Sequence, residues 1–168
     1  MTAPPGQEGG EVGVDEGMEA TVQRLADLEA IRALKVRYAR YADDGYDAEG
    51  IASLFTEDGV WDGGALFGRC EGRDGLVAHF RGAPERIPWA LHYVLCPEID
   101  LAPDGRSATG TWYLWQPCTR RRRSGDEQAF LAGTYADTYV KTDEGWRFAT
   151  VTVDARWLED PGEGRLPG

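Results

Sequence analysis

Residues 25–45 read LADLEAIRALKVRYARYADDG, and this stretch decides the first half of the fold. Its apolar residues recur at spacings of three and four, the period of one face of an α-helix. They are Leu25, Leu28, Ile31, Leu34, Tyr38 and Tyr41. The turn-forming sequence Asp43-Asp44-Gly45 then ends the pattern. The stretch therefore predicts one long helix that buries an apolar stripe.

Working outward, the sequence predicts shorter helices first and long strands afterwards. Apolar residues predict a second helix around 51–55, a brief strand at Val60-Trp61 and a third helix over 72–80. Beyond Pro88, alternating patterns separated by turn sequences predict four long strands. These strands cover 89–101, 107–119, 128–141 and 146–157. Helices followed by an antiparallel meander indicate an α+β domain, in which a strongly bent sheet around the long helix would enclose a pocket.

The bulk composition fits one small acidic domain. The chain has 168 residues, with six Trp and seven Tyr, which suggest a pocket or interface as well as a core. The net charge of -11 disfavours binding to nucleic acid or an anionic membrane. We expect a Pro/Gly/Glu-rich disordered tail at 1–17, the folded domain at 18–158 and a second flexible tail at 159–168.

Several classes of protein are disfavoured by motifs that the sequence lacks. The three Cys show no CxxC spacing, which argues against a disulfide framework or zinc site and fits a reducing compartment. No apolar run is long enough to span a membrane, and residues 1–17 lack the pattern of a signal peptide. No nucleotide-binding loop or cluster of metal ligands is recognisable. We expect a cytoplasmic protein without cofactor or metal.

Only two histidines are candidates for acid–base chemistry. His92 lies in a predicted strand, on one face with the small residues Ala90, Val94 and Cys96, so that face has room beside the imidazole. A satisfied core histidine is the alternative interpretation. His79, in the third predicted helix, is expected at the helix surface or half-buried.

Other polar residues allow a structural or a functional interpretation. Asp43 and Asp44 both lie at a helix C-terminus, where the helix dipole disfavours a carboxylate, and such a conflict is common at functional residues. The local pattern leaves open which of the two points inward. Tyr38 lies on the apolar stripe and could simply pack in the core. The basic cluster 120–123 is typical of a solvated hairpin end, with a phosphate or coenzyme A contact as the alternative.

Taken together, several segments resemble the SnoaL-like proteins of the nuclear-transport-factor-2-like superfamily. The resemblance spans about residues 25–157, and its segments are specific as a set rather than singly. They are 28–38 with Asp43, 54–61, Leu91-His92-Tyr93, 97–99, 108–114, 133–139 and Gly145-Trp146. The resemblance implies a cone-shaped α+β barrel with three N-terminal helices packed on a strongly curved, mostly antiparallel sheet that encloses a pocket.

Within this family the chain is most similar to the lyase branch, which includes bile acid 7α-dehydratase, scytalone dehydratase and lindane dehydrochlorinase. The resemblance implies a cofactor-free, usually homotrimeric enzyme that acts on a small hydrophobic substrate, although a dimer is also open. It assigns the Asp–His pair of that branch to Asp43 and His92, and a helix tyrosine to Tyr38. His92 would abstract a proton beside a carbonyl, Asp43 would orient it, and Tyr38 would polarise the carbonyl or protonate the leaving hydroxyl.

The predicted substrate-binding residues come partly from the residue types and partly from the family resemblance. Trp61, Trp89, Trp112 and Trp115 are candidate walls for a ring-containing substrate, although strand alternation places Trp112 and Trp115 on opposite faces. Gln116 occupies a position where the dehydratase carries an acid, so a second acid role is open to question. The branch also carries an arginine in its last strand, which corresponds here to Arg156 or, one residue earlier, to Ala155.

Two alternatives to a dehydratase remain open on the sequence. A polyketide or terpenoid cyclase or isomerase would use Asp43 and His92 for enolisation without loss of water. A binding module without catalysis would use the same fold, because a fold by itself does not set a function. A catalytic site requires that the side chains of Asp43 and His92 meet at a cavity.

Overall fold

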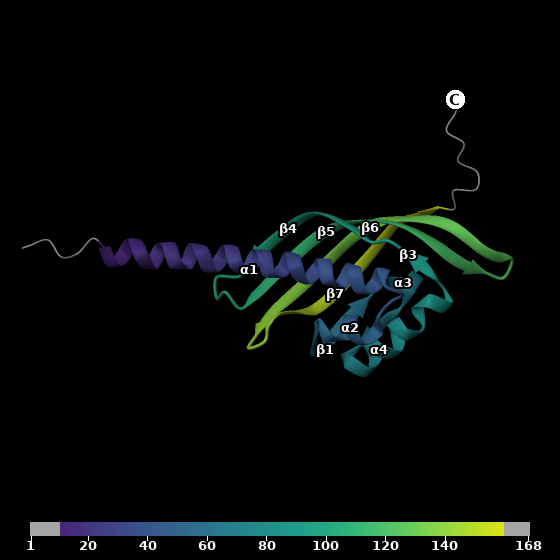
Figure 1. The fold of residues 1–168 in the computed structure, drawn as a ribbon, viewed down its shortest axis with the longest axis horizontal. Helices are drawn as coiled ribbons and strands as arrows, with labels where there is room; N and C mark the ends of the chain where they lie inside the picture. The colour runs from purple at the N-terminus through teal and green to yellow at the C-terminus, as the bar shows by residue number, and fades with distance from the viewer. Residues whose placement is uncertain (1–10, 160–168) are drawn as a thin grey trace, which may run out of the picture.

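The computed structural model describes residues 11–159, which form one curved sheet and the helices that pack on it (Figure 1). Its helical elements are α1 (Glu11–Asp43), α2 (Ala48–Ser53), α3 (Gly64–Phe67), α4 (Gly72–Arg81) and the 3-10 turn η1 (Ala83–Glu85). Its strands are β1 (Phe55–Asp62), β2 (Arg69–Glu71), β3 (Trp89–Ala90), β4 (Tyr93–Leu101), β5 (Ser107–Arg122), β6 (Gly125–Thr142) and β7 (Gly145–Glu159).

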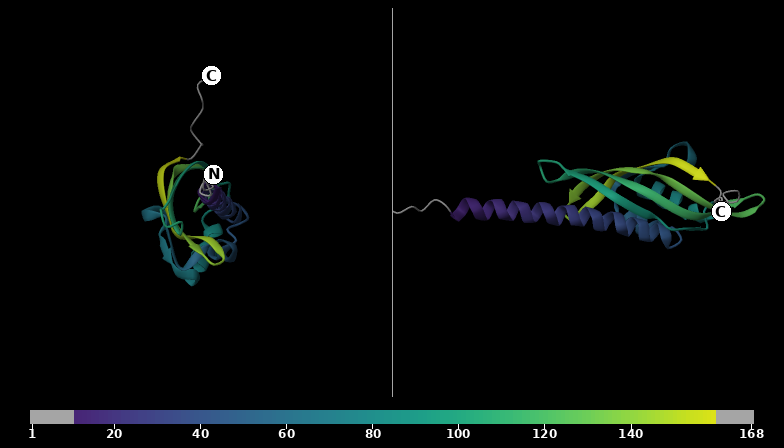
Figure 2. Two further views of the ribbon diagram at one scale, coloured as in Figure 1. Left: turned by 90° about the vertical axis from the view of Figure 1, so that its left-hand side faces the viewer. Right: turned by 90° about the horizontal axis from the view of Figure 1, so that it is seen from above.

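The seven strands form one mixed sheet in the order β2-β1-β7-β6-β5-β3, with β4 also paired to β5. Only β1 and β7 run parallel, and the other neighbours are antiparallel. Seen end-on, the sheet bends into a curved wall (Figure 2). The predicted α+β fold, with an N-terminal helix packed on a strongly curved sheet, is confirmed. The short elements α3 and η1 were not predicted.

The first long strand differs from the prediction, because it is divided into β3 and β4 at Leu91 and His92. The cause is Pro117, which lies opposite Leu91 on β5. Leu91 N–H donates to the Pro117 carbonyl at 3.0 Å, but proline has no N–H to return the bond. Regular pairing therefore stops for two residues. At that break the edge of the sheet is open to a partner from another element.

Helix α1 extends further toward the N-terminus than its apolar stripe requires. It begins at Glu11, inside the stretch expected to be a tail, and its first part continues beyond the sheet (Figures 1 and 2). Leu25 is exposed, contrary to the prediction, because it lies two and a half turns from the buried Leu34 and so on the opposite face of the helix. Ile31, Leu34 and Tyr38 are buried as predicted. The rest of the predicted N-terminal tail (1–10) and the end of the C-terminal one (160–168) lie outside the described residues.

Two further predictions concern membrane spans and cysteines. No helix of the described part of the chain is long and apolar enough to cross a membrane. The three cysteines are free thiols, of which Cys118 is buried, Cys70 half-buried and Cys96 exposed.

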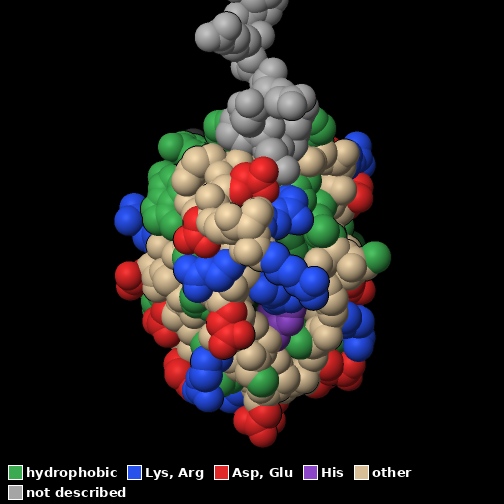
Figure 3. All heavy atoms as spheres, turned by 90° about the vertical axis from the view of Figure 1, so that its right-hand side faces the viewer, with side chains coloured by type: hydrophobic (Ala, Val, Ile, Leu, Met, Phe, Trp, Pro, Cys, Tyr) green, Lys and Arg blue, Asp and Glu red, His purple; other side chains and the backbone are tan. Residues whose placement is uncertain are grey.

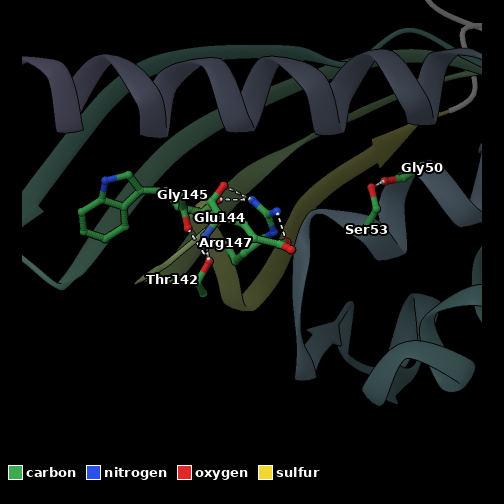
Figure 4. A network of polar contacts seen from close by, with 7 residues as sticks. Gly50, Ser53, Thr142, Glu144, Gly145 and Arg147 are labelled. Carbon is green, nitrogen blue, oxygen red and sulfur yellow. Dashed lines mark hydrogen bonds and ion pairs between the residues drawn. The ribbon is translucent and has the colours of Figure 1, made fainter.

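The turn between β6 and β7 shows how local chemistry sets the register of the sheet (Figure 4). Thr142 Oγ1 donates to the Gly145 carbonyl at 2.8 Å and accepts the Glu144 N–H. Gly145 has a φ of 104°, which favours glycine. Arg147 pairs with the Glu144 carboxylate at 3.1 Å across the turn. This closed turn aligns β7 so that Trp146 and Phe148 are buried.

A buried ion pair joins the middle of α1 to the sheet. Lys35 Nζ lies 2.8 Å from Asp137 Oδ2 on β6, and neither side chain is exposed. Tyr139 donates its hydroxyl to the same oxygen, and the ammonium group lies 3.4 Å from the centroid of the Tyr135 ring. Burial lowers the pKa of Lys35 to about 8 and raises that of Asp137, while their mutual attraction opposes both shifts. The pair therefore anchors α1 at one register on the sheet.

Replacing Lys35 by Met should destabilise the protein strongly, because Asp137 would be buried without a cation. We expect a loss of about 3–5 kcal/mol in the free energy of unfolding, measured by urea denaturation. The double variant Lys35→Met/Asp137→Leu should recover much of this loss. Glu49→Gln, which removes an exposed ion pair with Arg81, is the control and should cost about 0.5 kcal/mol or less. A double variant as unstable as Lys35→Met would contradict this role.

Candidate active site

A cavity of about 240 Å³ opens between the curved sheet and the helices that cover it. This is the volume of about eight water molecules in the liquid, enough for a small ring-containing molecule. The wall is mostly aromatic and aliphatic, and it contains both histidines of the chain. The polar and aromatic residues of the lining include Tyr38, Tyr46, Trp61, His79, Phe80, Arg86, His92, Gln116, Arg120 and Arg121.

The structure brings Asp43 and His92 into direct contact at the end of α1. Asp43 Oδ1 lies 2.8 Å from Nδ1 of the imidazole and also accepts the His92 backbone N–H at 2.8 Å. The imidazole lines the cavity and is 6% exposed, whereas Asp43 lies behind it, outside the lining. Because a carboxylate oxygen faces Nδ1, that nitrogen carries the proton in the neutral ring. Nε2 is then the basic nitrogen.

Two local features of the sequence place this pair. At the end of α1, Gly45 and Tyr46 both adopt positive φ, and the Tyr46 N–H returns to the Ala42 carbonyl, so the helix stops with Asp43 at its last turn. Because Leu91 bonds to β5, the next N–H, that of His92, points to the open edge of the sheet. Asp43 accepts this N–H and orients the ring with the same oxygen.

Gln116 faces the same space as His92 from the neighbouring strand. Tyr93 pairs with Trp115 and Ala90 with Cys118, so Gln116 lies opposite His92 on the inner face. Its side chain is buried and lines the cavity, and no hydrogen bond joins its amide to another described residue. A buried polar group without a protein partner is costly. The amide is therefore available to a polar group of a bound ligand.

Tyr38 and Trp61 form a second polar contact in the cavity wall. The Trp61 indole N–H donates to the Tyr38 hydroxyl at 2.8 Å, and both side chains line the cavity. Burial raises the pKa of Tyr38 far above its usual value, so the hydroxyl stays protonated. Because its oxygen already accepts from Trp61, its proton can be donated to another acceptor.

Tyr46 and His79 are among the lining residues that the sequence interpretation did not select. Tyr46 meets the His92 ring edge-on at 6.0 Å between centroids, and burial raises the pKa of its hydroxyl. The ring centroid of His79 lies 4.7 Å from that of Trp61. Burial lowers the pKa of His79, and the charge of Arg86 adds a smaller lowering effect. His79 is half-buried as predicted, but it also lines the cavity. Nothing in the local pattern of either residue points to this, because both positions follow from helix packing.

Four residues predicted to bind substrate lie elsewhere. Trp89 points outward from β3, since its neighbour Ala90 points inward, and Trp115 is exposed on the outer face of β5. Trp112 is buried away from the cavity, with its indole bonded to Tyr139. Arg156 occupies a bulge of β7, where the pairing passes from Trp157 to Ala155, and it pairs with Asp154 at the surface. Trp61 and Gln116 do line the cavity.

This arrangement can carry out acid–base chemistry on a bound molecule. It provides a basic imidazole nitrogen, oriented from behind by a carboxylate, in a largely apolar wall. Hydroxyl donors from Tyr38 and Tyr46 and an amide from Gln116 line the same space. No group of three His, Cys, Asp or Glu side chains within the described part of the chain is placed to hold a metal ion.

Removing the Asp43 carboxylate should disturb the local structure before any reaction is considered. We expect Asp43→Ala to cost about 1–3 kcal/mol in the free energy of unfolding, since the buried His92 groups lose their acceptor. Asp43→Asn keeps an acceptor oxygen and should cost less. Long-range ¹H–¹⁵N correlation spectra should show the Nδ1–H tautomer of His92 in the wild type and a mixture in Asp43→Ala. The same tautomer in both proteins would refute the orienting role of Asp43.

Comparison with known proteins agrees with this fold. A proposed scytalone dehydratase of Novosphingobium aromaticivorans superposes with a TM-score of 0.72 at 24% identity, covering 83% of this chain and 91% of its own. A type 2 hexachlorocyclohexane dehydrochlorinase gives 0.77 at 16% identity, covering 88% and 97%. A proposed aromatic ring hydroxylase of N. aromaticivorans gives 0.72 at 23% identity, covering 81% and 94%.

These similarities are low in sequence, so they establish the fold and leave the reaction open. No protein among the curated sequences matches the chain. The profile of the SnoaL-like domain, however, matches residues 23–152, which is most of the chain. The chain belongs to the SnoaL-like family, within the nuclear-transport-factor-2-like superfamily.

Proposed function

We propose that this protein is a cofactor-independent lyase of the dehydratase type, acting on a small hydrophobic molecule that contains a ring. One observation carries the proposal: the imidazole of His92 lines an apolar cavity, and its Nδ1 lies 2.8 Å from Asp43 Oδ1. The scytalone dehydratase-like and dehydrochlorinase neighbours, whose names denote eliminations, support the same class. The fold alone would not, because it hosts many functions.

The proposed reaction removes water from a β-hydroxy carbonyl compound. His92 Nε2 takes the proton from the carbon beside the carbonyl, and the electron pair of that C–H bond forms the new double bond. The C–O bond to the hydroxyl breaks, and the departing oxygen leaves as water once it receives a proton. Asp43 stabilises the imidazolium that forms during the transfer, because its carboxylate stays at Nδ1. The apolar wall strengthens this attraction by excluding solvent.

The proton for the departing oxygen would come from a hydroxyl of the wall. Tyr38 is the proposed donor, because its oxygen already accepts from Trp61 and its proton remains to be donated. Gln116 would hold the substrate carbonyl with its amide N–H, since it lies opposite His92. An amide cannot supply a proton, so we assign to Gln116 a binding role only.

A cyclase or isomerase is the second candidate, and a specific observation favours it. Within residues 11–159, no carboxylic acid lines the cavity, so the described wall offers no strong acid to assist a departing hydroxyl. An isomerisation or an intramolecular aldol addition needs the same base but no departing group. The two reactions differ in product mass, because only the dehydration product loses one water.

We also propose that copies of the chain associate, as the resemblance implies, and that they do so through the outer face of the sheet. Large side chains lie there across neighbouring strands. Tyr93 of β4 pairs with Trp115 of β5, and Ala132 of β6 pairs with Trp115 on one side and with Trp157 of β7 on the other. The rings of Trp115 and Trp157 stack at 5.9 Å, and both remain partly exposed. Exposed apolar patches of this kind usually bind a partner. A second copy presents the same rows, so it offers a self-complementary surface.

Variants of the pair should lose proton abstraction while they remain folded. We expect His92→Ala and Asp43→Asn to slow hydrogen–deuterium exchange beside the carbonyl of 2-tetralone, followed by NMR, by a factor of about 10²–10⁴. The control is Asp44→Asn, a neighbour at the same helix end, which should exchange like the wild type. A panel of ring-containing β-hydroxy ketones, analysed by mass, then separates dehydration from isomerisation. Equal exchange by His92→Ala and wild type would refute the proposed base.

A charge on the outer face should prevent association. We expect Trp115→Glu to sediment as a monomer at concentrations where the wild type is a dimer or trimer, because a carboxylate would be buried between copies. Val36→Glu is the matched control, since it places the same charge on the exposed side of α1. Analytical ultracentrifugation measures both variants. A monomeric wild type, or an unchanged Trp115→Glu, would disprove this interface.

A further inference from the structure

The charges at the cavity contrast with those of the chain as a whole. The chain carries a net charge of -11, yet among the described residues those that line the cavity include three arginines and no Asp or Glu. These are Arg86, which follows η1, and Arg120 and Arg121 near the end of β5. Figure 3 shows the end of the molecule where the β5–β6 hairpin lies. On this surface several Lys and Arg side chains surround a histidine. The rim is thus basic in an acidic protein.

A backbone contact brings these arginines together from distant parts of the sequence. The Arg121 N–H donates to the Arg86 carbonyl at 2.8 Å, beyond the point where β3 ends its pairing with β5. The segment after η1 is therefore held beside the end of β5. Residues 120–123 lie at the β5–β6 hairpin end as predicted, and Arg120 and Arg121 also line the cavity.

Of the three rim arginines, Arg120 and Arg121 have interaction partners, so the charge left for a ligand is chiefly that of Arg86. Arg121 pairs with Asp126 at 3.1 Å, and that contact is about half exposed to solvent. Arg86 forms no ion pair with any described residue. Its charge acts on the cavity wall, since it contributes to lowering the pKa of His79 and opposes the rise in that of Tyr46. Tyr46 in turn contacts the ring of His92 edge-on, at 6.0 Å between centroids.

We propose that the substrate carries a carboxylate, held at the rim by Arg86 with Arg120 and Arg121, while its ring lies against Trp61 and Phe80. This rests on the proposed function and adds the chemical class of the substrate. A guanidinium group matches a carboxylate with two parallel hydrogen bonds. A cluster of one sign at the mouth of an apolar cleft also attracts anions selectively. The same charge would stabilise the enolate formed when His92 removes a proton.

The test compares two probes of nearly the same shape, 2-naphthoate and 2-naphthamide, by isothermal titration calorimetry at low salt. We expect 2-naphthoate to bind about tenfold more tightly or better, as a charged hydrogen bond predicts. Arg86→Met should remove most of this preference. Arg122→Met is the matched control, because it removes the same charge from an exposed residue of β5 outside the lining. It should keep the preference. Added salt should weaken binding of 2-naphthoate more than that of 2-naphthamide.

Three results would overturn the proposal. One is that the wild type binds the two probes equally tightly, or that it binds neither of them. Another is a preference that survives in Arg86→Met, with circular dichroism confirming the fold. The third is tight binding of free coenzyme A without a preference for 2-naphthoate, since the arginines would then bind the phosphates of a carrier. Binding is measured here without turnover, so a failed exchange assay with 2-tetralone would refute the base and leave this result standing.

Discussion

The structure depends on how α1 is tied to the inner face of the sheet. Three polar residues about two turns apart along the helix each meet a partner on the strands. Asp27 accepts from the Trp146 indole and pairs with Lys141, Lys35 pairs with Asp137, and Asp43 accepts from His92. Such groups are costly to bury unless they are paired, so a shifted helix would leave them unsatisfied. The apolar stripe holds the helix on the sheet, and the polar ties set its register.

The last of these ties is also the centre of the proposed site. Because α1 cannot slide, Asp43 arrives at the break between β3 and β4, where His92 has an N–H without a strand partner. One carboxylate oxygen then bonds both the backbone and the ring of His92. A proline on the neighbouring strand ends the regular pairing there, and strand alternation directs the His92 N–H to the open edge of the sheet, where Asp43 accepts it. The geometry of the pair is a consequence of the fold, and its rigidity suits a base that must meet a carbon atom.

The two faces of the sheet have separate chemical characters. The inner face combines a buried ionic network beneath α1 with the cavity, and the aromatic rings of Tyr38, Tyr135 and Phe148 lie between them. The outer face carries the aromatic rows of β4, β5 and β7. Strand alternation produces this division, since adjacent residues of β5 such as Trp115 and Gln116 serve opposite faces. A small domain thereby holds a pocket and a surface for association in one sheet.

The sequence by itself determined the elements whose cause is local. The periodic apolar residues from Ile31 to Tyr38 predict the buried part of α1, and the alternating strands after Pro88 predict the meander. Family resemblance added the pairing of Asp43 with His92. Tertiary structure alone decided what depends on register and on contacts between distant segments. It turned Trp89, Trp112 and Arg156 away from the cavity, the last through a bulge that no local pattern shows. It also brought Tyr46, His79 and Arg86 to the wall, because the closing of a curved sheet over helices fixes which side chains meet there.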